Sequence, residues 1–201
     1  MEIISPEQNL YIRVLRRYST IKISSEKKYS IDGGLDSLNS FLASKPVFRT
    51  GINYQAAEST YLRASWGQGF RAPSFMERFI DWNHVQFNYL VQGNPDLEPE
   101  KSEGINIGIE YVNTSKYQMS LMFYQTKFEN LIEDFAIKPG LLSYQNIDKA
   151  TFSGLELMCQ LRISDQLDSR WGINWVNNVD GQNKTIPNTI PLSLTGSTNY
   201  K

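Results

Sequence analysis

Alternation of apolar and polar residues is the feature that most constrains the fold of this chain. In residues 105–111 every odd-numbered position is apolar, and polar or small residues fall between them. The same period of two runs through 117–123, 153–163 and 171–175, and more weakly through 192–200. Successive side chains of a β-strand point to opposite faces of the sheet, so these segments are predicted to be strands with one apolar and one polar face.

The predicted strands are long. Adding 46–54, 59–67 and the less regular 10–23 gives about eight strands and no amphipathic helix. Several of these runs hold nine or more residues, whereas strands of soluble proteins most often hold about 5–6. A tilted strand that crosses a bilayer needs about 9–11 residues. We further expect 144–163 to be one strand that projects beyond the membrane.

The connections between these strands alternate between two kinds. Short turns are expected at 55–58, 113–116 and 164–168, and longer connections at 24–45, 68–100, 138–143 and 180–191. Bacterial outer-membrane barrels have short turns on the periplasmic side and longer loops on the outside. The pattern therefore predicts a segment of an antiparallel transmembrane β-barrel, an all-β fold.

Composition excludes several function classes. The chain has 20 Lys+Arg against 21 Asp+Glu, one His and one Cys, so it lacks the basic surface of a typical nucleic-acid binder, an internal disulfide and any site built on two imidazoles. No nucleophile–base pair, phosphate-binding glycine loop or metal-ligand cluster is recognisable. We expect neither an enzyme nor a bound cofactor or metal.

In such a barrel the apolar face contacts outer-membrane lipid and the polar face borders the lumen. Asn106, Glu110 and Glu156 fall on the polar face, which consists of small and hydrophilic residues and suggests a wide, wet or plugged interior. Aromatic residues stand near the ends of the predicted strands, where they favour the lipid headgroup layer. They are Tyr54, Tyr61, Tyr111, Tyr117 and Trp171.

Five short motifs follow one another in a defined order. Residues 69–74 read GFRAPS, 93–100 GNPDLEPE, 107–111 IGIEY, 146–148 NID and 154–156 GLE. Each is weak alone, but the succession, with its phase of strands and loops, closely resembles the C-terminal half of the barrel of TonB-dependent outer-membrane receptors. The resemblance covers about residues 46–200, and Glu98 stands where that family often has Lys.

The resemblance implies a receptor with a barrel of about 22 strands, closed by an N-terminal plug domain. Such receptors take up bulky nutrients (ferric siderophores, haem, cobalamin or glycans) with energy from the TonB complex. We accordingly expect 46–201 to be part of such a barrel, without its plug, leader, coupling segment and last strands. The chain would then be a fragment or truncated product, not transport-competent alone. Residues 1–45 match the family poorly and are expected to hold one possible strand and a loop.

The resemblance also suggests functional residues. Acidic lumen residues of the family pair with plug arginines, which makes Glu156 a candidate for plug contact, with Asn106 and Glu110 beside it. Arg71 either contacts ligand or plug, or anchors its loop at the barrel rim. The remaining motif residues are expected to shape that loop. They are Gly69, Phe70, Pro73, Asn94, Pro95, Pro99 and Glu100.

The loop between the first two motifs also carries exposed-looking rings. Trp82, His84 and Tyr89 would contact a haem or sugar by stacking, or would form a small aromatic cluster within the loop. Two other interpretations of the chain remain open. One is a soluble carbohydrate-binding β-sandwich that uses these three residues, and the other is a small self-closed outer-membrane adhesin barrel. The sequence does not identify the transported substrate.

Overall fold

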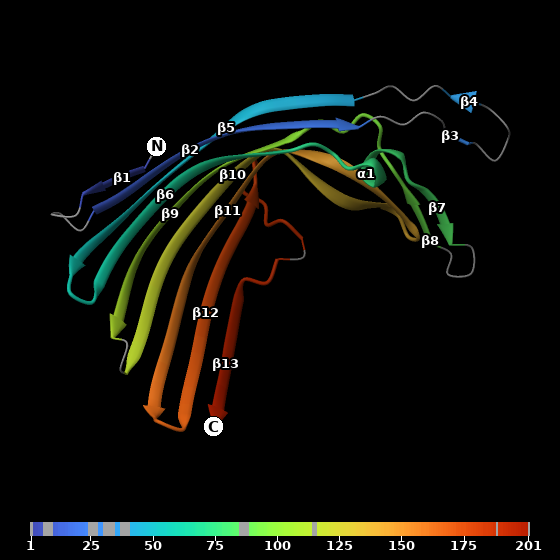
Figure 1. The fold of residues 1–201 in the computed structure, drawn as a ribbon. Helices are drawn as coiled ribbons and strands as arrows, with labels where there is room; N and C mark the ends of the chain where they lie inside the picture. The colour runs from blue at the N-terminus through green and yellow to red at the C-terminus, as the bar shows by residue number, and fades with distance from the viewer. Residues whose placement is uncertain are drawn as a thin grey trace.

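The computed structural model describes residues 2–5, 10–23, 28–29, 35–36, 41–84, 89–113, 116–187 and 189–200. Its main feature is a single curved sheet of 11 strands, nine of which follow one another as antiparallel neighbours in the order β1-β2-β5-β6-β9-β10-β11-β12-β13. Figure 1 shows these strands as one bent wall, with the remaining short elements gathered at one end of it.

The strands of the wall are β1 (Glu2–Ser5), β2 (Leu10–Ile23), β5 (Phe41–Ala57), β6 (Thr60–Arg71), β9 (Glu100–Asn113), β10 (Tyr117–Lys138), β11 (Leu141–Ser164), β12 (Leu167–Asp180) and β13 (Leu192–Tyr200). A helix, α1 (Phe75–Phe79), and a hairpin of β7 (Asp81–His84) and β8 (Tyr89–Gln92) lie between β6 and β9. The strands β3 (Lys28–Tyr29) and β4 (Leu35–Asp36) pair only with each other.

The strand register sorts the side chains into rows that cross the wall. One row, the apolar row, consists of Leu10, Tyr54, Leu62, Ile109, Leu121, Leu157, Ile173 and Leu194, which are successive cross-strand partners. The adjacent row, the polar row, consists of Tyr11, Asn53, Arg63, Gly108, Met122, Glu156, Asn174 and Ser193. Since neighbouring positions of a strand point to opposite faces, one face of the wall is apolar and the other largely polar.

The apolar face is the more exposed of the two. Ile107 is 56% and Ile109 45% exposed, whereas the next residue after each, Gly108 and Glu110, is half-buried. Hollows of about 260 and 570 Å³ are lined mainly by residues of the polar face, which marks that face as the concave side. A soluble protein buries its apolar face, so this arrangement fits a wall whose convex side contacts lipid.

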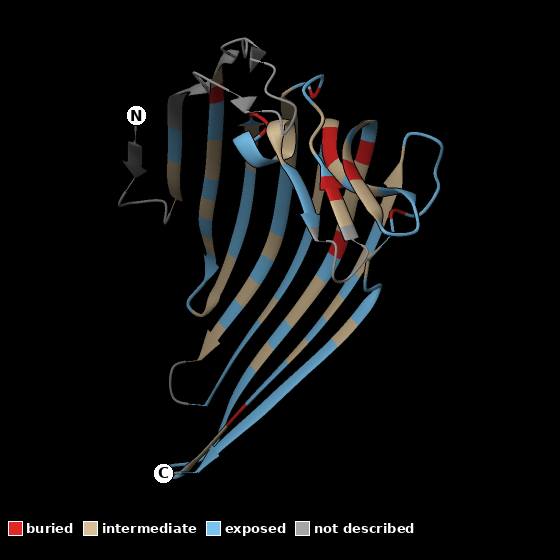
Figure 2. Cartoon of the chain, turned by 90° about the vertical axis from the view of Figure 1, so that its right-hand side faces the viewer, coloured by how far each residue is buried: buried red, intermediate tan, exposed pale blue. Residues whose placement is uncertain are grey.

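Buried residues concentrate at the end of the wall where the long connections lie (Figure 2). Leu131, Ala150 and Ile186 form a small hydrophobic cluster there, with Phe128 and Phe152 packed against it. Elsewhere in the described part of the wall, the strands are joined by their backbone ladders and by polar side-chain contacts such as that between Arg63 and Glu110.

The sequence predicted the long strands correctly. All eight predicted segments are strands, and β11 runs without interruption from Leu141 to Ser164. The short connections from β5 to β6, from β9 to β10 and from β11 to β12, and the long ones after β2, β6 and β12, also agree with the prediction. None of the described helices is long and apolar enough to span a membrane.

Three details of the prediction are wrong. Residues 138–143 do not form a longer loop, because β10 and β11 continue to a tight turn at Pro139 and Gly140, where Gly140 has φ 82°. Tyr61 does not belong to the aromatic belt, because it pairs with Glu110 and therefore lies on the polar face. The short elements β1, β3, β4, β7, β8 and α1 were not predicted.

The fold does not support the two alternative interpretations. A sandwich would cover the apolar row with a second sheet, yet most of this row is exposed in the structure. In the described part of the chain β1 and β13 end the strand order without pairing with each other, so the sheet is not a self-closed small barrel.

Candidate functional site

Arg71 sits at the end of β6, where the wall meets the loop elements. Its guanidinium forms ion pairs with Glu77 of α1 at 2.8 Å and with Glu100 at the start of β9 at 2.9 Å. Glu100 also accepts a hydrogen bond from the backbone N–H of Ile132 in β10 at 3.3 Å. Arg71 thus ties α1, β9 and β10 together at the rim, which favours its expected role as a structural anchor.

The helix that Arg71 contacts begins with a capping box. The hydroxyl of Ser74 accepts from the N–H of Glu77 at 3.2 Å, and the Glu77 carboxylate accepts from the N–H of Ser74 at 2.6 Å. Burial would raise the pKa of Glu77, but the hydrogen bonds from Arg71 and Ser74 and the charge of Arg71 outweigh it, so this pKa is lowered. Burial likewise opposes the charge of Arg71, and its two carboxylate partners nevertheless raise its pKa.

We expect Glu77→Gln to lower the free energy of local opening of residues 72–80 by about 0.2–1 kcal/mol. The effect is small because the ion pair between Glu77 and Arg71 is partly solvated. A carboxyl whose folded pKa is lowered stabilises the folded state above its unfolded pKa and loses this contribution as the pH falls through its folded pKa. The difference between wild type and variant should therefore be present at pH 7 and shrink as the pH falls below the ordinary value of 4.5.

Amide hydrogen exchange of residues 72–80 between pH 7 and pH 3 measures this effect. Glu58→Gln, in the short turn at the opposite end of the wall, is the matched control and should change nothing in this segment. A difference that is constant with pH would show that the charge of Glu77 does not stabilise the helix.

The segment 93–100 is held against β10 and β11 by Asn146. The Asn146 carbonyl oxygen accepts from the N–H of Glu98 at 2.8 Å, and its amide donates to the backbone carbonyls of Glu98 at 3.1 Å and Asn130 at 2.8 Å. The Glu98 carboxylate in turn accepts from the side chain of Asn130 at 2.7 Å. Asn130 adopts φ 56°, a left-handed conformation that Asn tolerates better than most residues.

The rest of this segment is fixed by close packing and by Asn94. The Asn94 side chain donates to the carbonyl of Tyr144 at 3.0 Å and accepts from the N–H of Asp96 at 2.9 Å. Leu97 is 2% exposed and Pro73 is fully buried. A Cβ at Gly93 would lie 2.6 Å from the backbone of Arg78, so only glycine allows α1 to approach this closely.

The other residues of the family motif also serve the loop. At Gly69 the hydroxyl of Ser102 occupies the place of a side chain, since a Cβ there would lie 2.3 Å from it unless the serine changed rotamer. The carbonyl of Pro95 accepts a hydrogen bond from the Arg78 guanidinium. Phe70 pairs with Lys101 across the sheet, and Pro99 directly precedes the start of β9.

Two of the three lumen candidates engage neighbours on the polar face. Glu110 forms an ion pair with Arg63 at 2.6 Å and accepts from Gln118 at 2.7 Å. The Asn106 amide donates to the hydroxyl of Ser65 at 3.1 Å. Both residues lie on β9 and line the concave surface, where Asn106 borders the hollow of about 570 Å³.

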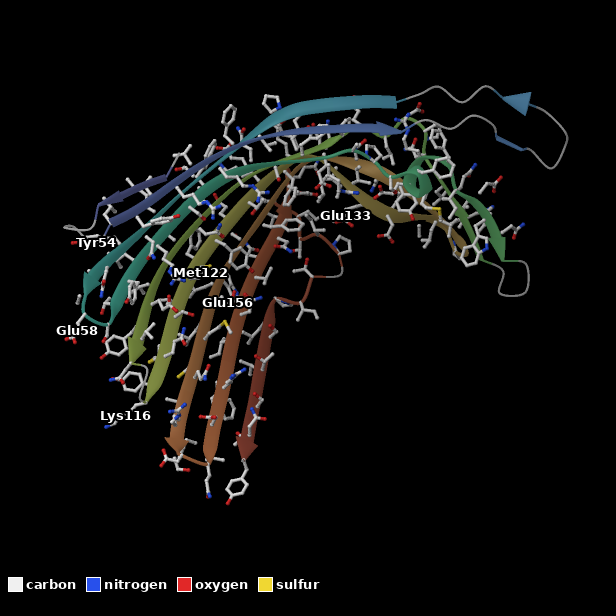
Figure 3. All side chains as sticks on the ribbon, in the orientation of Figure 1. Tyr54, Glu58, Lys116, Met122, Glu133 and Glu156 are labelled. Atoms are coloured by element: carbon white, nitrogen blue, oxygen red, sulfur yellow. The ribbon has the colours of Figure 1, made fainter. Side chains whose placement is uncertain are left out.

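Glu156 stands apart from that pair. It faces Met122 on β10 and Asn174 on β12, and no ion pair to it is found among the described residues (Figure 3). Beside it, Tyr124 of β10 crosses β11 at Gly154 and donates to the Asn174 side chain at 3.3 Å. The structure thus does not bring Glu156 together with Glu110, since β10 runs between their strands.

The three loop residues considered for ligand contact share one hairpin. Trp82 is opposite Val91, and His84 is opposite Tyr89. The Trp82 side chain is 49% exposed, whereas the side chains of His84 and Tyr89 lie outside the described residues. Leu90 and Val91 of β8 pair with Leu141 and Leu142 of β11, so the hairpin is attached to the wall.

Sequence reasoning missed Glu77, Asn130 and Asn146 as organisers of the rim. The pattern Ser74–Glu77, a Ser followed three residues later by Glu, is a recognised start signal of a helix and could have indicated α1. For Asn130 and Asn146, which lie 16 residues apart, no local pattern signals their contact. Groups of three or more potential metal-binding side chains are absent from the described part of the chain.

Comparison with known proteins agrees with this geometry. A family model described as "TonB dependent receptor-like, beta-barrel" matches residues 17–201. The chain belongs to this family. TonB-dependent receptors of this kind reside in the bacterial outer membrane. The exposed apolar row of this chain therefore contacts the lipid of that membrane.

Curated relatives of this TonB-dependent receptor chain cover different nutrients. It is 25% identical over 138 residues to the hemoglobin and hemoglobin-haptoglobin-binding protein B of Haemophilus influenzae, a match that covers 63% of the chain and 13% of the relative. It is 32% identical over 112 residues to the vitamin B12 transporter BtuB of Vibrio vulnificus, covering 55% of the chain and 17% of the relative. The chain thus spans less than a fifth of the length of these two relatives.

Solved structures show the same fold. The copper transporter OprC superposes with a TM-score of 0.78 at 16% identity, over 100% of the chain and 32% of that structure. The pyoverdine outer membrane receptor FpvA from Pseudomonas aeruginosa gives a TM-score of 0.70 at 18% identity, over 100% of the chain and 27% of that structure. The wall described above is therefore a part of a TonB-dependent receptor barrel.

Proposed function

We propose that this chain forms part of the barrel wall of an outer-membrane receptor that takes up a bulky nutrient with energy from the TonB complex. The observation that carries the proposal is the pair of adjacent rows, one apolar and exposed, the other polar and concave, within a barrel of this family. A wall of this kind is suited to enclose a plug domain and a hydrated path.

The concave surface is the part of the wall that we assign to the plug. Glu156, Glu110 and Asn106 present a carboxylate, an ion-paired carboxylate and an amide to the interior, and the nearby hollow is large enough for several side chains. Of these, Glu156 is the best candidate for pairing with a plug cation, because Glu110 is already neutralised by Arg63.

The transported nutrient belongs to the group of ferric siderophores, haem, cobalamin and glycans. The names of several relatives concern hemoglobin, heme or iron, which favours an iron-containing nutrient. The hairpin that carries Trp82 is the element of this chain best placed to contact it, because it lies at the end of the wall with the long connections (Figure 1).

Growth complementation tests this proposal. The receptor that contains this chain, expressed in a bacterial strain without its own haem, siderophore and cobalamin receptors, should restore growth on one of these nutrients. Growth should be lost when TonB is deleted, and the 201-residue chain alone should not restore it. Uptake that persists without TonB would indicate a passive pore and would contradict the proposal.

A further inference from the structure

Two side chains of opposite charge stand on the concave side of the wall, one on each of two neighbouring strands. Glu156 lies on β11 and Arg170 on β12. Arg170 is opposite Gln160 of β11, which shares the face of Glu156, and opposite Ser197 of β13. Arg170 is exposed, and neither charge forms an ion pair among the described residues. Both charges therefore face the interior of the barrel.

Neighbouring residues of the wall do not neutralise this pair of charges. The residues opposite Glu156 are Met122 and Asn174, which carry no charge. The acid nearest to Arg170 in sequence on the same face is Asp168, whose carboxylate lies 3.6 Å from the Arg162 guanidinium. Four residues of β12 separate Arg170 from the residue opposite Glu156, which corresponds to about 13 Å along the strand. A group that lies between the two charges can therefore contact both.

The surface between the two charges is hollowed. Two adjoining hollows of about 260 and 210 Å³ share Met158, Gly172 and Thr195 in their lining, and together we call them the trough. Arg170 borders the first hollow and Glu156 the second. The other polar side chains of the trough are mostly amides and hydroxyls, which include Ser120, Gln160, Asn174, Ser193, Thr195 and Ser197. Because amides and hydroxyls both donate and accept hydrogen bonds, the trough suits the backbone of a peptide segment.

The acidic wall residues expected from the family resemblance would bind plug cations only. Asn106 is an amide, and Glu110 is 2.6 Å from the guanidinium of Arg63, so Glu156 is the member of this group that remains without a charged partner. Arg170 adds a contact of the opposite sign, for which that resemblance gives no role. A partner that matches both charges has a cation and a carboxylate in a fixed order along its chain.

We propose that Arg170 binds a carboxylate of the receptor's plug domain, and that the plug segment between this carboxylate and a cation at Glu156 lies in the trough. The inference rests on the proposed function, which places a plug inside the wall, and it names a second contact and its sign. Two contacts of opposite sign fix the direction of the segment, because a reversed segment would bring like charges together.

Entry of vancomycin into cells that produce the receptor containing this chain tests the contact, since a receptor that holds its plug does not admit a molecule of this size. Arg170→Gln should raise the fraction of receptor with a displaced plug about two- to fivefold, as expected for the loss of a partly solvated ion pair. Arg170→Glu should raise it further, because two carboxylates then meet. Lys116→Gln, an equal charge change in the short turn after β9, is the matched control and should leave entry unchanged.

Rescue identifies the partner of Arg170. In the Arg170→Glu receptor each Asp and Glu of the plug is replaced by Lys in turn, and one of these substitutions should restore low vancomycin entry. Heat-dependent gel migration shows that each variant barrel is folded. Unchanged entry in the Arg170→Glu receptor, or the absence of a rescuing substitution, would overturn the contact.

Two further results separate this contact from nutrient uptake. A raised KM for uptake with unchanged vancomycin entry would assign Arg170 to the nutrient and would equally overturn the contact with the plug. Growth that no longer needs TonB in the wild type would contradict the proposed function, whereas unchanged vancomycin entry beside TonB-dependent growth would contradict this inference alone.

Discussion

Leu157→Arg should lower the free energy of unfolding of the membrane-inserted barrel by about 2–4 kcal/mol. Leu157 belongs to the apolar row, between Leu121 and Ile173, where an arginine would face hydrocarbon. Part of the protein should then fail to insert. Urea titration of the barrel in lipid vesicles, followed by tryptophan fluorescence, measures the loss.

The neighbouring residue provides a matched control. Glu156→Gln changes a side chain of the polar row, one position away on the opposite face, and should leave insertion and stability intact. A silent Leu157→Arg together with a disruptive Glu156→Gln would mean that the assignment of the two faces is inverted.

Asn146→Ala should release the segment 93–100 from the wall. The substitution removes three hydrogen bonds and leaves the N–H of Glu98 and the carbonyl of Asn130 without this partner, at a cost of about 2–3 kcal/mol in local stability. Faster amide exchange at Glu98 and faster proteolysis within 93–100 are the expected results, with unchanged heat-dependent gel migration of the barrel.

Gln145→Ala is the matched control for this experiment. Gln145 precedes Asn146 in β11, is exposed and forms no side-chain hydrogen bond in the described structure. It should leave the exchange of Glu98 unchanged. If the two variants behaved alike, or if Asn146→Ala left 93–100 protected, the packing of Leu97 and Pro73 would be sufficient to hold the segment.

The part of the fold that lies in the membrane was predictable from the sequence because one physical rule governs it. Lipid on one side and a hydrated interior on the other impose period two, as in β9 from Ile105 to Tyr111. Beyond the membrane this rule lapses. The outer half of β10, from Glu129 to Lys138, meets water and neighbouring segments on both faces, so its sequence does not alternate and the hairpin with β11 was expected to end in a longer loop.

The rim was less predictable than the wall because its contacts join residues far apart in sequence. The motif around Arg71 pointed to the correct loop, and an anchoring role was among the expectations, but its partner Glu100 is 29 residues away. The link between Glu98 and Asn146 spans 48 residues. Only the tertiary structure shows that the GNPDLEPE and NID motifs contact each other.

The glycine of the GLE motif illustrates how closely the interior surface is fitted. A Cβ at Gly154 would lie 2.4 Å from the Tyr124 ring and 2.6 Å from the backbone of Trp175. Glycine inside a strand usually weakens it. Here the missing side chain leaves room for the Tyr124 ring, whose hydroxyl donates to Asn174. A smaller residue at Tyr124 would therefore not make room for a side chain at 154, because the backbone carbonyl of Trp175 would still block it, so the path of β12 also requires glycine here.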